Sequence, residues 1–183
     1  MHILDLVQNS VEAGALNVVL TISEDLDDDF LTISVEDDGK GMAPEFAASA
    51  KNPFTTSRTT RKVGLGLPLV DMTTQMTGGR LDIQSIPGAG TKITAVYRRN
   101  HIDRPPLGDI ATTVKIFVVS YQQIFFRYEH IMKRQGCQNA FLLDTRELRG
   151  ILGEYIDFGN SLVREWLDNY LKEGLSNLDC TEE

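Results

Sequence analysis

The sequence predicts an α+β fold followed by a smaller α/β unit. Apolar residues recur at helical spacing near the start, strand-like segments follow in pairs, and a proline-containing segment separates the first hundred residues from the rest. We therefore expect residues 1–100 to form one α+β sandwich domain and 101–108 to be a linker. Residues 109–183 are expected to form a small C-terminal α/β docking module.

The first element is predicted to be a helix with one apolar and one polar face. Gly14 is a plausible end for it, because a glycine accepts the backbone conformation that closes many helices. The apolar face carries Ile3, Leu4, Val7 and Val11, and the polar face carries Asp5, Gln8, Asn9 and Glu12.

The rest of the first domain alternates between strands and helices. Alternating or β-rich composition predicts the strands, and two adjacent glycines, Gly78 and Gly79, end the longer helix. The predicted strands are 17–23, 30–37, 80–85 and 92–98, and the predicted helices are 44–50 and 65–76.

Beyond the linker, we expect strands at 114–119 and 140–143. The sequence Asp-Thr-Arg-Glu at 144–147 resembles a capping box that opens a helix. A final amphipathic helix is predicted to include Leu162 and to end at Gly174. Nothing after the linker has catalytic spacing.

Composition is that of an ordinary globular protein, with 42% hydrophobic and 24% charged residues among 183. The net charge of −8 argues against a nucleic-acid partner and against an anionic membrane surface, since both attract clustered Lys and Arg. No apolar run approaches the roughly 20 residues that span a bilayer, and no signal-peptide pattern opens the chain. We expect a cytoplasmic protein in which Cys137 and Cys180 are reduced thiols.

Asp5 and Asn9 lie four residues apart, so a helix presents them on one face. Asn9 offers a neutral oxygen for Mg²⁺, and Asp5 is suited to orienting or deprotonating an attacking hydroxyl or water through a bridging water. The alternative is that both are solvated positions.

Asp37 is predicted at the end of a strand, followed by Gly39 and Gly41, where the backbone can turn closely around a flat ligand. A carboxylate there can accept a hydrogen bond from the exocyclic amine of adenine, whereas guanine would present a carbonyl oxygen. An ordinary turn is the alternative.

Gly64 and Gly66 precede a helix, whose first N–H groups attract phosphate. The cations Arg58, Arg61 and Lys62 just before it either screen a triphosphate or are simply exposed. The glycines around Thr91 are explained by a hairpin turn, and Thr91 itself is predicted to contact the ligand.

Together these segments resemble the ATP-binding domain of the GHKL, or Bergerat-fold, family, which includes gyrase, heat-shock chaperones, sensor histidine kinases and MutL. The resemblance covers residues 1 to about 99 and is nearest to the histidine-kinase-like members. It implies a mixed sheet with helices on one face. The matching boxes are the N box at 5–15, the G1 box at 37–42, the F box at 52–56 and the G2 box at 64–67, followed by 77–81 and 87–91.

The resemblance implies ATP and Mg²⁺ as ligands. Asn9 would bind the metal, Asp37 would bind the adenine amine, and Asp5 would occupy the general-base position, where gyrase-like and MutL-like members usually carry the longer Glu. The other implied ligand-binding residues are Gly39, Gly41, Met42, Phe54, Thr55, Thr56, Arg58, Arg61, Lys62, Gly64, Leu65, Gly66, Leu67 and Thr91.

We expect an Mg²⁺-dependent ATP-binding protein that acts as a signalling protein kinase or slow ATPase on a protein partner. No hairpin with a phosphoacceptor histidine precedes the N box, so autophosphorylation as in a complete sensor kinase is not expected. The alternative is a non-enzymatic ATP-sensing adaptor that binds a partner through its C-terminal module. An ATP-driven DNA clamp is disfavoured by the acidity, and association with further copies of the chain stays open.

Overall fold

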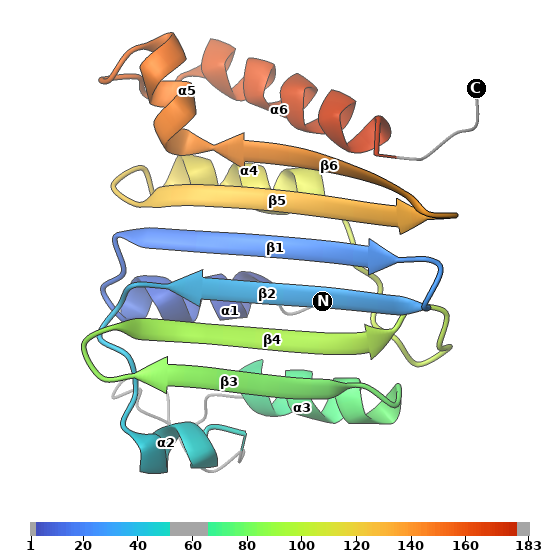
Figure 1. Ribbon diagram of the computed structural model, residues 1–183. Coiled ribbons are helices and arrows are strands. Elements are labelled where there is room, and N and C mark those ends of the chain that lie inside the picture. The colour runs from blue at the N-terminus through green and yellow to red at the C-terminus, as the bar shows by residue number, and fades with distance from the viewer. Residues whose placement is uncertain (1–2, 52–65, 179–183) are drawn as a thin grey trace.

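A single six-stranded mixed sheet forms the centre of the protein in the computed structural model, which describes residues 3–51 and 66–178 (Figure 1). The strand order is β3-β4-β2-β1-β5-β6. In chain order the elements are α1 (Ile3–Glu12), β1 (Asn17–Asp25), β2 (Phe30–Asp37), α2 (Pro44–Ser49), α3 (Gly66–Met76), β3 (Arg80–Ile86), β4 (Gly90–Arg98), α4 (Ile110–Ser120), β5 (Phe125–Arg134), β6 (Cys137–Asp144), α5 (Thr145–Leu152) and α6 (Ser161–Ser176).

The core lies between the sheet and the helices behind it. Figure 1 shows α1, α3 and α4 on one face of the sheet. Alternate residues of β1 and β2 point into this layer, because successive side chains of a strand project to opposite faces. The buried set in these two strands is Val18, Leu20, Ile22, Leu31, Ile33 and Val35. The α+β class and the mixed sheet with helices on one face are thus confirmed.

The sheet continues without a break across the predicted linker. Strand β5 pairs in parallel with β1 along its length, and β6 pairs antiparallel with β5. Helix α6 packs on α4, and its Tyr170 contacts the Phe141 ring of β6. The residues after 108 contain both helices and strands, but their two strands, β5 and β6, add to the sheet of the first hundred residues. The division into two units stays a prediction.

Two predictions for the C-terminal region are wrong. Residues 114–119 lie in helix α4, which Asp109 caps by accepting the Thr112 N–H, and Val114, Phe117 and Val118 form its buried face. The final helix continues through Gly174 to Ser176. A Cβ at Gly174 would lie 2.0 Å from a ring carbon of Phe141, so this glycine permits close helix–sheet packing instead of ending the helix.

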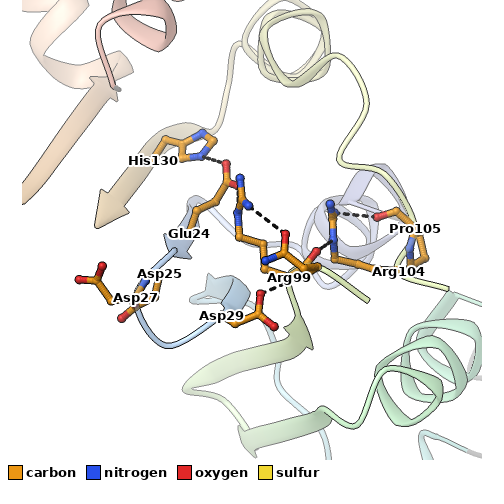
Figure 2. Close-up of polar contacts among 9 residues, drawn as sticks. Glu24, Asp25, Asp27, Asp29, Arg99, Arg104, Pro105 and His130 are labelled. Carbon is orange, nitrogen blue, oxygen red and sulfur yellow. Dashed lines mark hydrogen bonds and ion pairs between the residues drawn. The ribbon is translucent and has the colours of Figure 1, made fainter. Parts of the chain in front are cut away.

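A partly buried polar cluster joins strands at the end of the sheet opposite Asp37 (Figure 2). The Glu24 carboxylate accepts from His130 Nε2 at 3.1 Å and from Arg99 Nε at 3.0 Å, and His130 Nδ1 lies 2.7 Å from the Tyr128 hydroxyl. The hydrogen bond from His130 lowers the pKa of Glu24 against the opposing effect of burial, and Arg99 adds to the lowering. This cluster joins β1 and β5 to Arg99, which directly follows β4.

Candidate nucleotide site

The site predicted from the sequence gathers where β2 ends, β4 begins and α1 crosses behind the sheet. Asp37 is the last residue of β2, and the strand register places it opposite Thr91 of β4. Thr91 in turn pairs with Ser85 of β3. Residues from three strands therefore meet at one end of the sheet.

The Asp37 carboxylate is held in one orientation by two donors. Ser10 Oγ of α1 donates to Oδ2 at 2.7 Å, and the Gly39 backbone N–H donates to Oδ1 at 2.9 Å. A carboxylate offers about four lone-pair sites, so these bonds leave acceptor capacity on Asp37. The arrangement fixes the side chain and keeps its ability to accept a further hydrogen bond.

Ser10 was not among the predicted site residues. It is 1% exposed and lies on the buried face of α1, three residues after Val7. A polar residue on the apolar face of a helix needs a hydrogen-bond partner, because an unpaired buried hydroxyl is costly. The position of Ser10 on the apolar face was therefore a signal in the sequence that its hydroxyl has a hydrogen-bond partner in the fold.

Two glycines bring the turn after β2 into close contact with its neighbours. A Cβ at Gly39 would lie 2.8 Å from the Ala13 Cβ of the segment after α1. Gly41 has φ of +64°, and a Cβ there would lie 2.1 Å from the Ile86 carbonyl oxygen. Both glycines are required by backbone packing around Asp37, whatever they contact in a ligand.

Met42 and Thr91 meet at a shared serine. The Met42 N–H donates to Ser85 Oγ at 2.8 Å, and Ser85 Oγ lies 2.8 Å from Thr91 Oγ1. Thr91 is buried, with 9% of its surface exposed. The structure therefore places Thr91 opposite Asp37 and joins Met42 to Thr91 through Ser85, a residue that was not predicted from the sequence.

The polar face of α1 meets the start of α3. Asp5 lies in the first turn of α1, and a Cβ at Gly66 would lie 3.3 Å from the Asp5 Cβ. Asn9 follows one helical turn later and is half-buried. Leu67 packs against the hydrophobic core. Helix α1 therefore presents Asp5 and Asn9 toward the α3 side, while Ser10 contacts Asp37.

The predicted Phe54, Thr55, Thr56, Arg58, Arg61, Lys62, Gly64 and Leu65 lie outside the described residues. The predictions for the F box and for most of the G2 box therefore stay predictions.

The second aspartate of the Asp37-Asp38 pair has a structural role. Its Oδ1 accepts from the Leu16 and Asn17 N–H groups, both at 2.8 Å, and the Asn17 side-chain amide donates to Oδ2. Desolvation acts to raise the pKa of Asp38, but the bonds from Asn17 and Leu16 outweigh it and the pKa is lowered. Asp38 thus fixes the start of β1 against the turn that carries Asp37.

The residues present suit a nucleotide-bound magnesium ion. Asn9 supplies a hard oxygen atom of the kind that Mg²⁺ prefers, and this ion usually takes only one or two protein ligands together with substrate phosphates and waters. Within residues 3–51 and 66–178, no three His, Cys, Asp or Glu side chains converge on a metal site. The same ranges contain no helix long and apolar enough to cross a bilayer.

Comparison with known proteins agrees with the sequence resemblance. Residues 2–101 match the family described as histidine kinase-, DNA gyrase B- and HSP90-like ATPase. The chain is 32% identical over 111 residues to the non-motile and phage-resistance protein of Caulobacter vibrioides, covering 56% of this chain and 13% of that protein. It is also 32% identical over 93 residues to the sensor histidine kinase ZraS of Klebsiella oxytoca, covering 50% of this chain and 20% of the kinase.

Among solved structures, the N-terminal domain of a DNA repair protein shares the fold. Its TM-score is 0.51 at 15% identity, and the match covers 83% of this chain and 56% of that one. The chain spans a fifth or less of the length of the two curated relatives described above. Because the family match extends over more than half of the 183 residues, the chain belongs to the histidine kinase-, DNA gyrase B- and HSP90-like ATPases and carries an ATP-binding domain of the histidine-kinase type.

Proposed function

We propose that this protein binds Mg-ATP and acts as a signalling protein kinase or slow ATPase on a protein partner. The observation that carries the proposal is the Asp37 carboxylate, oriented by Ser10 and Gly39 at the sheet end that α1 and α3 adjoin. Helix α1 therefore lies between two binding groups. On one side is the Asp37 carboxylate, which accepts from the base, and on the other is the start of α3, which binds the phosphates.

Asp37 selects the base. With Ser10 and Gly39 satisfying part of its acceptor capacity, its remaining lone pairs accept the exocyclic amine of adenine. Guanine presents a carbonyl oxygen at that position, which would face the carboxylate with like partial charge. Thr91 lies next to Asp37 and limits the space on the β4 side.

The α1–α3 contact receives the phosphates. Backbone N–H groups at the start of α3 point toward an anion, and the helix dipole favours negative charge there. Asn9 would hold the magnesium ion through its amide oxygen, and the ion, when bound, would neutralise charge on the phosphates. The carboxylate of Asp5 lies against the same helix start, where it accepts a proton from an attacking hydroxyl or water through a bridging water.

Substitution of Asp5 and of Asn9, one at a time, separates the proton-accepting role from the metal-binding role. With ATP labelled at the γ-phosphate, wild-type protein should release or transfer the label. Asp5→Asn should retain Mg-ATP binding and lose about 10²–10⁴-fold in rate, the usual contribution of general acid–base catalysis. Asn9→Ala should weaken binding in Mg²⁺ more than in EDTA. Gln8→Ala, on the same helix, is the matched control.

Unchanged turnover in Asp5→Asn would exclude its role as base. Failure of the wild-type protein to bind Mg-ATP would refute the proposal as a whole.

The second candidate is a non-enzymatic ATP-sensing adaptor. It is favoured by the direct connection from the site to the C-terminal residues, since Asn17 donates to Asp38 and accepts a hydrogen bond from Arg146 of α5. Nucleotide binding beside Asp37 would then change the conformation of the C-terminal surface without hydrolysis or transfer of the γ-phosphate. Label release or transfer by the wild-type protein excludes this candidate, whereas tight ATP binding without either outcome, in the presence of the partner, supports it.

A further inference from the structure

A surface hollow of about 590 Å³ lies where α5 and the following segment meet the start of β5. Its lining includes Gln122, Phe125, Arg146, Arg149, Glu154 and Tyr155. All of these residues belong to the region after the predicted linker, for which the nucleotide site gives no role.

Two aromatic side chains that line the hollow are exposed to solvent. Tyr155 is 94% exposed and Phe125 is 41% exposed. Exposed aromatic residues that share one concave surface are typical of interaction sites, whereas scattered ones are ordinary. Tyrosine and arginine are also the side chains that most often dominate the energy of protein interfaces.

The hollow also presents a cation without an acidic partner. The Arg146 guanidinium lies 4.4 Å above the centre of the Phe125 ring and donates one N–H to the Asn17 side chain. Among the described residues, neither Arg146 nor Arg149 forms an ion pair. Arg146 therefore retains several donors for an anionic group.

Two acidic side chains near the hollow, Asp144 and Asp157, already accept hydrogen bonds within the protein. Asp144 accepts the Arg146 backbone N–H at 2.8 Å as the cap of α5. Asp157 accepts from the Gln122 amide at 2.9 Å and from the Gly159 N–H at 2.8 Å. Glu154 is the carboxylate that lines the hollow itself. The hollow therefore combines the Arg146 guanidinium with the Glu154 carboxylate, and Arg146 is the group that can receive an anionic side chain.

The walls of the hollow are held in place by internal bonds. Arg149 donates to the Gln122 carbonyl at 2.8 Å and to the Glu154 carbonyl at 3.0 Å, and it lies over the Phe158 ring. The Phe158 N–H donates to the Gln122 side chain at 3.1 Å. Because Arg149 is used in this way, Arg146 is the arginine available to a partner. A preformed surface loses little freedom on binding.

We propose that this hollow docks an acidic segment of a protein partner, with a carboxylate on Arg146 and an apolar side chain between Phe125 and Tyr155. The inference deepens the proposed function, which calls for a protein partner. Docking here places the partner at the same end of the sheet as the proposed nucleotide site, because α5 and the start of β5 lie at the end where β2 finishes (Figure 1). Arg146 and Asp38 also bind opposite ends of one Asn17 amide.

Charge and shape favour a protein segment over other ligands. A nucleic acid would bring many phosphates to an acidic molecule with one available arginine here, which opposes binding. A small molecule is usually buried over most of its surface, whereas the nearly fully exposed Tyr155 forms an open rim. A peptide of mixed acidic and apolar residues satisfies both the charge and the aromatic surface.

The test is selection of random displayed peptides on the immobilised full chain, followed by fluorescence polarisation with the selected peptides. Selected sequences should combine Asp or Glu with Leu, Phe or Trp. Tyr155→Ala and Arg146→Ala should each raise Kd at least about tenfold, as expected for hot-spot residues. Arg134→Ala, an exposed arginine at the far end of β5, should change Kd by less than about twofold.

The proposal would be overturned if no peptide is selected, if the selected peptides are basic, or if the Tyr155 and Arg146 variants bind the peptides with the wild-type Kd. So would an oligonucleotide that displaces the peptide and binds through Arg146. Mg-ATP binding is measured by calorimetry on the same proteins. If peptide docking succeeds while ATP binding is absent, the proposed function fails and the docking surface stands; the reverse result rejects the surface alone.

Discussion

Replacement of Asp37 by Asn tests the nucleotide site with little disturbance of the fold. In the wild type, Oδ1 accepts from the Gly39 N–H and Oδ2 from the Ser10 hydroxyl. The Asn oxygen can keep the Gly39 bond, and its NH₂ can donate to Ser10 Oγ, because a hydroxyl also accepts. The native contacts therefore have replacements, whereas the adenine amine loses a charged acceptor.

The expected cost follows from that one lost bond. A hydrogen bond to a charged group contributes about 1.5–3 kcal/mol, so the Kd for Mg-ATP should rise about 10- to 150-fold. Isothermal titration calorimetry measures this, and thermal unfolding verifies that the variant is folded. Glu36→Gln is the matched control, since Glu36 precedes Asp37 on β2 and forms an exposed ion pair with Lys92 at 2.9 Å. A folded Asp37→Asn protein with wild-type affinity would refute the assignment of Asp37 to the base.

Three further predictions concern stability. Gly174→Ala should lower the free energy of unfolding by about 1–3 kcal/mol, because its Cβ would meet the Phe141 ring at 2.0 Å; wild-type stability by denaturant unfolding would refute the packing described for α6. Gly150→Ala, in α5 with nothing within 4 Å of its Cβ, should instead raise stability by about 0.5–1 kcal/mol; a loss of stability would contradict that open environment. The lowered pKa of Glu24 stabilises the fold above the ordinary pKa of 4.5, and this contribution is lost as pH falls from 4.5 through the lower folded-state value. Unfolding free energies should therefore drop more steeply over that acidic range in the wild type than in Glu24→Gln, and parallel curves would show that the His130 and Arg99 bonds to Glu24 contribute nothing.

Local pattern was sufficient for the sheet of the first hundred residues and insufficient beyond it. Strands β1 and β2 alternate buried and half-buried residues along most of their length, which is the pattern the sequence shows. Residues 114–119 are rich in β-branched side chains and favour a strand locally. Tertiary packing favours a helix instead, because Val114, Phe117 and Val118 occur at helical spacing and bury one face of it.

Strand β5 was missed for a related reason. Phe126, Tyr128 and His130 alternate with exposed or half-buried residues, but charged residues lie among them and one of the buried positions is a histidine. The burial of His130 depends on Glu24 of β1, a residue 106 positions away in the chain. A single sequence shows no such long-range partner.

The candidate site was predictable where its residues lie close together in the chain. Asp37, Gly39 and Gly41 form one turn, so their spacing is itself a signal. Ser10 and Ser85 act through side chains that meet Asp37 and Thr91 only after the strands pair and α1 packs. Their roles follow from tertiary structure, although the polar Ser10 on an apolar helix face gave a hint.

The most direct test of the account is calorimetric titration of the unmodified protein with ATP and with GTP, each in Mg²⁺. A carboxylate held by Ser10 and Gly39 should accept the adenine amine and oppose the guanine carbonyl oxygen. Sites with such a polar match reject the wrong ligand by as much as about 10⁴-fold, so we expect ATP to bind and GTP to bind at least about 100-fold more weakly. Equal affinities, or binding of neither nucleotide, would contradict the central claim that Asp37 selects adenine at this site.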